Sequence, residues 1–68
     1  MISDLDIWRA AAILVKRHGA DDAAIVAAQR GDEYHAKGDE DGYAIWKAIV
    51  DAILELRRGE PREGERVN

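Results

Sequence analysis

The sequence predicts an all-α protein, most simply a compact three-helix bundle, and three observations support this prediction. The chain of 68 residues is rich in alanine, isoleucine, leucine and charged residues and contains no threonine or phenylalanine, a composition that favours helices over strands. Apolar residues recur at spacings of three and four in three segments. A glycine follows each segment, at positions 19, 38 and 59, where helices commonly end.

The first helix is expected at residues 4–18. The hydroxyl of Ser3 can cap the free amides of a helix start, and the basic residues 16–18 suit the negative end of the helix dipole. Two apolar rows give this helix a wide apolar face. They are Leu5, Trp8, Ala12 and Val15 in one row, and Ile7, Ala11 and Leu14 in the other.

The second helix is expected at residues 21–37, with Asp21 or Asp22 as its N-cap. Small residues line one side of it: Ala24, Ala27, Ala28 and Gly31. They allow a close approach by another helix, so we expect this helix to be the central packing surface. Gly31 costs about 1 kcal/mol relative to alanine inside a helix, which indicates either a close crossing or a break near this residue.

The third helix is expected at residues 40–58, with Asp39 as its N-cap. Its apolar residues have the most regular helical spacing in the chain: Ile45, Ile49, Ala52, Ile53 and Leu56. Residues 1–59 are therefore expected to form one three-helix domain. Residues 60–68 mix charge with glycine and proline and have no apolar period, so we expect a disordered tail.

The sequence contains few residues that could serve as catalytic groups or as ligands for a metal ion or a cofactor. Cysteine is absent, and the single serine is the helix cap Ser3. An EF-hand alignment on Gly42 fails, because it places Lys37 and Ala48 where calcium needs oxygen ligands. His18 fits a cation at a helix end better than a metal ligand, and His35 fits a surface or interface residue. We expect no enzyme activity, no cofactor and no metal site.

Charge and hydropathy limit the classes of partner and the location that the sequence predicts. Fourteen acidic residues against ten basic ones give a net charge of −4, and no segment forms a basic face, which argues against direct binding to nucleic acid. Asp4 and Asp6 stand where a secretory signal would be basic, and the longest apolar run, residues 10–15, is too short to cross a bilayer. These features predict a cytoplasmic protein without a membrane segment.

The apolar faces of the first and third helices are wider than so small a bundle needs. Part of these faces is expected to stay exposed and to contact a partner, and tryptophan and tyrosine are favoured at such contacts. Trp8 and Trp46 fit either the core or an interface. The candidate interface residues are Ile7, Trp8, Leu14, Tyr43, Trp46 and Val50.

The function predicted from these features is a small non-enzymatic protein-interaction or regulatory module that self-associates as a homodimer or docks an apolar helix face on a protein partner. Small domains without disulfides commonly complete their core by oligomerisation. The alternative is a regulator of nucleic-acid processes, either a transcription accessory protein or an acidic inhibitor.

Two stretches of sequence show resemblances. Residues 34–49, with the turn Lys37-Gly38-Asp39, are similar to the helix-turn-helix of tetratricopeptide repeats, and we interpret this as a shared solution for a tight turn. Residues 4–11, the alanine-rich second helix and residues 46–49 resemble a family of short alphaproteobacterial helical proteins, a domain of unknown function. This second resemblance covers roughly residues 3–57, implies a bacterial protein and carries over no catalytic or binding residues.

Overall fold

The computed structural model describes residues 3–59, which form three helices: α1 (Asp4–His18), α2 (Ala20–Ala36) and α3 (Glu40–Gly59). The predicted all-α three-helix fold is confirmed, and each helix end lies within one residue of its predicted position. The predicted tail, residues 60–68, lies outside the described residues. None of the helices within residues 3–59 combines the length and the apolar character needed to cross a membrane.

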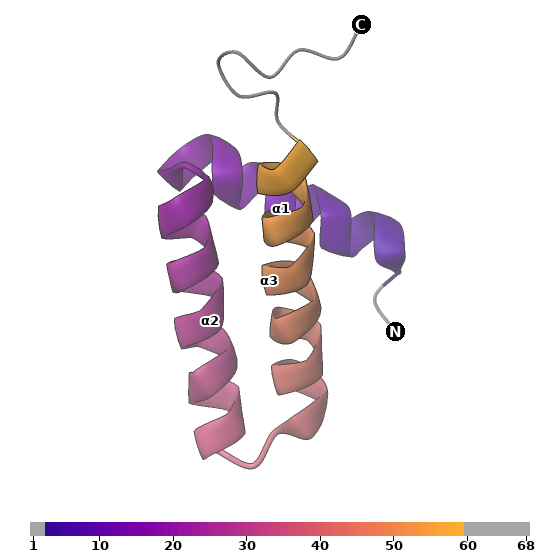
Figure 1. Cartoon of the computed structure of the whole chain (residues 1–68). Coiled ribbons are helices and arrows are strands. Elements are labelled where there is room, and N and C mark those ends of the chain that lie inside the picture. Colours follow the sequence, from indigo (N-terminus) through magenta and orange to yellow (C-terminus); the bar gives the residue numbers. More distant parts are fainter. Residues whose placement is uncertain (1–2, 60–68) are drawn as a thin grey trace, which may run out of the picture.

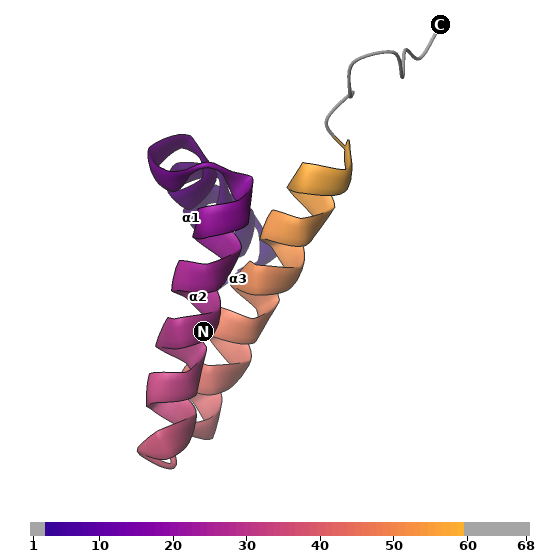
Figure 2. The same cartoon turned by 60° about the vertical axis from the view of Figure 1, so that its left-hand side comes forward.

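The three helices form a hairpin crossed by a third helix. α2 and α3 run antiparallel and pack against each other along their length, whereas α1 lies across one side of the hairpin, at the end where α2 begins and α3 stops (Figures 1 and 2). α1 contacts both other helices there.

The start of α1 is capped as predicted, but the start of α2 is not. The Ser3 hydroxyl accepts a hydrogen bond from the Asp6 amide at 3.2 Å. Gly19, at a φ of 84°, is the only residue between α1 and α2 and serves as the N-cap of α2 without a side-chain hydrogen bond. The prediction of Asp21 or Asp22 as the cap is wrong, because α2 already begins at Ala20; both aspartates lie in its first turn, where they complement the helix dipole.

A Schellman motif and an N-cap share the turn between α2 and α3. The Asp39 amide donates to the Tyr34 carbonyl at 2.9 Å, and the Gly38 amide donates to the His35 carbonyl at 3.0 Å. Gly38 has a φ of 78°, the conformation that this motif requires. The Asp39 carboxylate accepts from the Gly42 amide at 3.0 Å. The predicted cap is confirmed, and Asp39 both ends the turn and starts α3.

α2 is continuous through Gly31, where it lies close to α3. A Cβ atom added at Gly31 would lie 3.4 Å from the Trp46 Cβ, so this glycine marks a close crossing and not a break. The buried residues of α2 are spaced four apart, Ala23, Ala27 and Gly31. The prediction that Ala28 lies in this stripe is wrong: each residue turns the helix by about 100°, so Ala28 points away from the stripe and is exposed.

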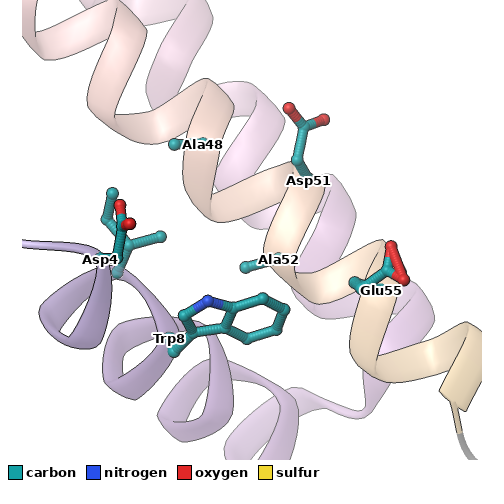
Figure 3. Close-up of a pocket in the computed structure, with 7 residues that line it drawn as sticks. Asp4, Trp8, Ala48, Asp51, Ala52 and Glu55 are labelled. Atoms are coloured by element: carbon teal, nitrogen blue, oxygen red, sulfur yellow. The ribbon is translucent and has the colours of Figure 1, made fainter.

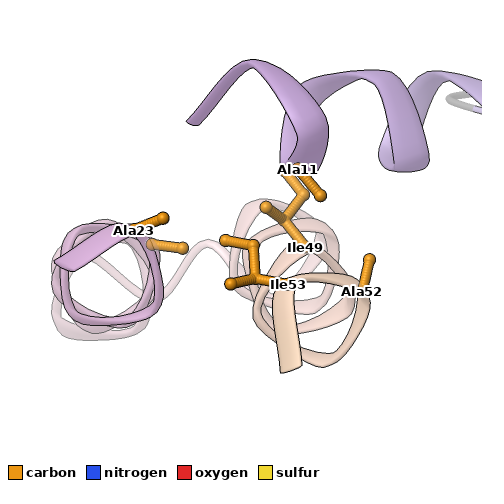
Figure 4. Packing of buried hydrophobic residues seen from close by; sticks show 6 residues of the cluster. Ala11, Ala23, Ile49, Ala52 and Ile53 are labelled. Carbon is orange, nitrogen blue, oxygen red and sulfur yellow. The ribbon is translucent and has the colours of Figure 1, made fainter. Parts of the chain in front are cut away.

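The core lies where the three helices meet, and it is small. Its buried apolar residues are Ala11, Ala23, Ala27, Ile49, Ala52 and Ile53. Ile49 points towards α1 and Ala11, and Ile53 points towards α2 (Figure 4). Ile53 is the one large side chain that is fully buried among the described residues. The alanines of the core let the helices come close, but they contribute little buried apolar surface.

Only one of the two apolar rows of α1 faces this core. Ala11 is buried, and Ile7 and Leu14 pack against the core cluster. In the other row, Val15 packs against the core cluster at the end nearest α2, but Leu5 is 58% exposed and Trp8 40% exposed. The wide apolar face of α1 therefore extends beyond what the hairpin covers.

Candidate interaction surfaces

The six predicted interface residues do not form one surface. Ile7 and Leu14 of α1 and Trp46 and Val50 of α3 are half-buried and pack against the core cluster. Trp46 also covers Gly31. Ile7 and Trp8 also line a groove between α1 and α3, whereas Tyr43 and Val50 lie on the side of the hairpin turned away from α1.

A groove with a volume of about 340 Å³ lies between α1 and α3 (Figure 3). We call it the α1–α3 groove, and its lining residues are Asp4, Ile7, Trp8, Ala48, Asp51, Ala52 and Glu55. The groove exists because α1 crosses α3 over Ala48 and Ala52, whose short side chains do not fill the angle between the helices. The Trp8 indole forms one wall and lies opposite these alanines (Figure 3).

The α1–α3 groove is acidic. Asp4 comes from the first turn of α1, and Asp51 and Glu55 come from successive turns of α3. None of the seven described residues that line the groove is a cation. Glu55 forms an ion pair with Arg58, which lies outside the lining. An apolar wall thus stands next to three exposed carboxylates.

The sequence prediction missed most of this groove. Asp51 and Glu55 are four residues apart, as are Ala48 and Ala52, so one face of the third helix carries both pairs. That spacing is visible in the sequence. The direction in which α1 crosses α3 is not visible in the sequence. Without that direction, the sequence does not indicate that Trp8 lies next to the two pairs.

The second surface is the side of the hairpin opposite α1, here called the open face. Ala48 and Ala52 mark the side of α3 that meets α1, so residues about half a turn around the helix point the other way. The residues of the open face are Tyr43, Val50 and Leu54 from α3 and Ala24 and Ala28 from α2. In Figure 1 this side faces the viewer, α1 passes behind the hairpin, and no described helix covers it.

Two contacts between α2 and α3 mark the ends of the open face. Near the α1 end, Arg57 forms an ion pair with Asp21 at 3.0 Å. Near the turn, the rings of His35 and Tyr43 contact each other, with centroids 4.9 Å apart and planes tilted by 43°. Between these contacts lies an apolar strip in which Leu54 is the most exposed large residue, at 41%.

The charges flanking this strip differ between the two helices. Helical spacing puts Asp21 and Asp32 of α2 on or beside the open face, together with Lys47 and Arg58 of α3. All four are exposed. The α2 edge therefore carries two aspartates, whereas the α3 edge carries two cations with Asp51 between them in the same row.

A search for metal sites and comparisons with known proteins give no further indication of function. Within residues 3–59, no group of three or more histidine, aspartate or glutamate side chains is placed to hold a metal ion. Comparisons with protein-family models, with curated proteins and with solved structures find no match to this chain.

Proposed function

We propose that this chain is a small non-enzymatic protein-interaction module that forms a homodimer through the open face. The observation that carries the proposal is the arrangement of the open face, a partly exposed apolar strip with Asp21 and Asp32 on its α2 edge and Lys47 and Arg58 on its α3 edge. Such a surface is complementary to itself when a second copy is turned by a two-fold rotation.

The two-fold axis that fits runs parallel to the hairpin within the interface. It sets α2 of each copy against α3 of the other. It also leaves the position of every residue along the hairpin axis, here called its height, unchanged. Contacts within the chain show which residues share a height: Asp21 pairs with Arg57, and Gly31 faces Trp46. For an α2 residue and the α3 residue at the same height, the two residue numbers therefore add up to about 78.

This relation brings exposed apolar residues together. Ile25 is 55% exposed and Leu54 is 41% exposed, and the two lie at nearly the same height on opposite edges of the hairpin. In the dimer, Leu54 of each copy meets Ile25 and the alanine strip of the other, Ala24 and Ala28. Full burial of such a side chain contributes roughly 1.5–3 kcal/mol, and two-fold symmetry doubles the contact.

The same relation brings opposite charges together. Asp32 of one copy is level with Lys47 of the other, and Asp21 is level with Arg58. Each pair occurs twice. Exposed ion pairs contribute little affinity, roughly 0–1 kcal/mol each, but they favour this register over one that places like charges together.

The small core supports a dimer. Four of the six buried apolar residues are alanines, and a domain of this size buries only a modest share of its surface. Domains this small commonly gain stability from a metal, disulfides or a second subunit, and the chain has no cysteine.

Light scattering coupled to size-exclusion chromatography, over a series of concentrations, tests the proposal. We expect the wild type to shift from monomer to dimer as concentration rises, and Leu54→Asp to stay monomeric. Ile13→Asp is the matched control, because Ile13 is 59% exposed and lies on the side of α1 away from both surfaces. A wild type that is monomeric throughout, or a control that is equally disruptive, would overturn the proposal.

A charge exchange tests the register. Lys47→Asp should weaken the dimer, since it faces Asp32 of the other copy, and Asp32→Lys should weaken it in the same way. The double variant should dimerise as the wild type does. If the double variant is weaker than either single variant, this register is wrong.

A further inference from the structure

We infer that the α1–α3 groove binds a basic amphipathic segment of a different protein, with an apolar side chain against Trp8 and arginine or lysine beside the carboxylates. This groove shares no residue with the open face, so the inference goes beyond the proposed dimer and does not depend on it.

The apolar part of the groove suits a side chain of the bound segment. Its volume of about 340 Å³ lies at the low end of the range for binding clefts, about 300–1,000 Å³. Ala48 and Ala52 keep the α3 backbone close to the surface, and the Trp8 indole lies opposite them (Figure 3). Trp8 is 40% exposed, so its ring still has apolar area to bury, and tryptophan is among the residues that contribute most to binding interfaces.

The charge of the groove selects a cationic partner. Asp4 lies on the α1 side, and Asp51 and Glu55 lie along α3 (Figure 3). Within residues 3–59, neither Asp4 nor Asp51 has an ion-pair partner. A cationic side chain in the groove therefore lies among carboxylates from both helices, close to the indole, whose face attracts cations.

The same charges disfavour the other classes of occupant. Phosphate groups of nucleic acid carry the same sign as the groove and would be repelled. A second copy of this chain carries a net charge of −4, and the open face already offers it a complementary surface. A basic segment with an apolar side is the partner that satisfies both parts of the groove.

The binding experiment uses two peptides and the full chain labelled with ¹⁵N. The first is a helical peptide with leucines along one side and arginines flanking them, and the second has glutamine in place of every arginine. We expect the arginine peptide to shift the amide signals of Ala48 and Ala52 and the indole N–H of Trp8. The glutamine peptide should bind roughly tenfold more weakly, the combined effect of a few exposed ion pairs.

Paired variants decide whether the carboxylates of the groove are responsible. Asp51→Asn combined with Glu55→Gln should weaken binding of the arginine peptide several-fold. Asp22→Asn combined with Glu33→Gln removes the same number of charges from α2, outside both surfaces, and should leave binding close to that of the wild type. Equal losses in the two pairs would show attraction to net charge alone and would overturn the inference.

Two further outcomes separate this inference from the dimer. The monomeric variant Leu54→Asp should bind the arginine peptide as the wild type does, whether or not the wild type dimerises. Trp8→Ala should weaken peptide binding without changing the concentration at which the dimer forms. Peptide shifts on the open face instead of the groove, or peptide binding by Trp8→Ala as tight as that of the wild type, would overturn the inference.

Discussion

The ring of Tyr34 rests on Gly42, in the first turn of α3. A Cβ atom at position 42 would lie 2.5 Å from Tyr34 Cδ1 and 2.8 Å from Cγ, closer than carbon atoms pack in proteins. These ring atoms lie next to the Tyr34 Cβ, at the end of the side chain nearest the backbone, so they cannot turn aside easily. At the scale of single residues, glycine at this position lets the ends of α2 and α3 close on each other.

Gly42→Ala should therefore destabilise the protein by about 1–3 kcal/mol, the usual cost of overpacking. Urea unfolding followed by circular dichroism measures this change. Gly31→Ala is the control: its Cβ would meet Trp46 at an ordinary contact distance of 3.4 Å, and alanine favours a helix by about 1 kcal/mol. We expect Gly31→Ala to be neutral or stabilising, and equal destabilisation by the two variants would contradict this account.

At the scale of the helices, the connections are as short as the geometry allows. Gly19 alone joins α1 to α2, and the Asp39 that completes the Schellman motif of α2 also caps α3. Short connections of this kind fix the direction of each helix relative to the preceding one. The hairpin therefore depends on local hydrogen bonds as well as on its apolar contacts.

Asp39→Ala removes the acceptor for the Gly42 amide and should lower the free energy of unfolding by about 0.5–2 kcal/mol, the usual cost of losing an N-cap. Asp39→Asn keeps an acceptor at the same place and should retain most of the stability. Thermal melting of the three proteins at one concentration provides the comparison. The account fails if the asparagine variant loses as much stability as the alanine variant.

The helices were predictable from sequence because their ends carry local signals. Ser3, Gly19, Gly38 and Asp39 act within a few residues of the chain, and the structure confirms the boundary that each one indicates. The buried row of α1 was not predictable in the same way. Both of its rows have helical spacing, and which one meets the hairpin depends on the crossing direction, a property of contacts distant in sequence.

At the scale of the whole molecule, dimerisation links stability to concentration. A dimer that forms from folded chains stabilises the folded state by mass action, so the melting temperature of the wild type should rise over a hundredfold increase in concentration. Leu54→Asp should melt at a temperature independent of concentration, and Ile13→Asp should follow the wild type. Calorimetry at several concentrations measures all three, and a wild-type melting temperature that does not change with concentration would contradict the dimer.

The two candidate surfaces lie at the limit of what the sequence can predict. The excess of apolar residues on α1 and α3 indicates that some will be exposed, and Trp8 and Leu54 are. The grouping of exposed residues into surfaces requires the arrangement of the helices. Trp8 joins Asp51 and Glu55 only because α1 crosses α3, and Ile25 shares a height with Leu54 only because the hairpin has a particular register.

The crossing of α1 has a consequence for how the molecule opens. α1 behaves as a ligand covalently joined to the hairpin: the single residue Gly19 keeps it at a high effective concentration, while the turn at Gly38 and Asp39 is complete without it. We expect α1 to detach in a partial opening that leaves α2 and α3 paired. In hydrogen-exchange measurements, amides of α1 around Ala11 should exchange faster than those of α3 around Ile53, and equal protection would show that the three helices open together.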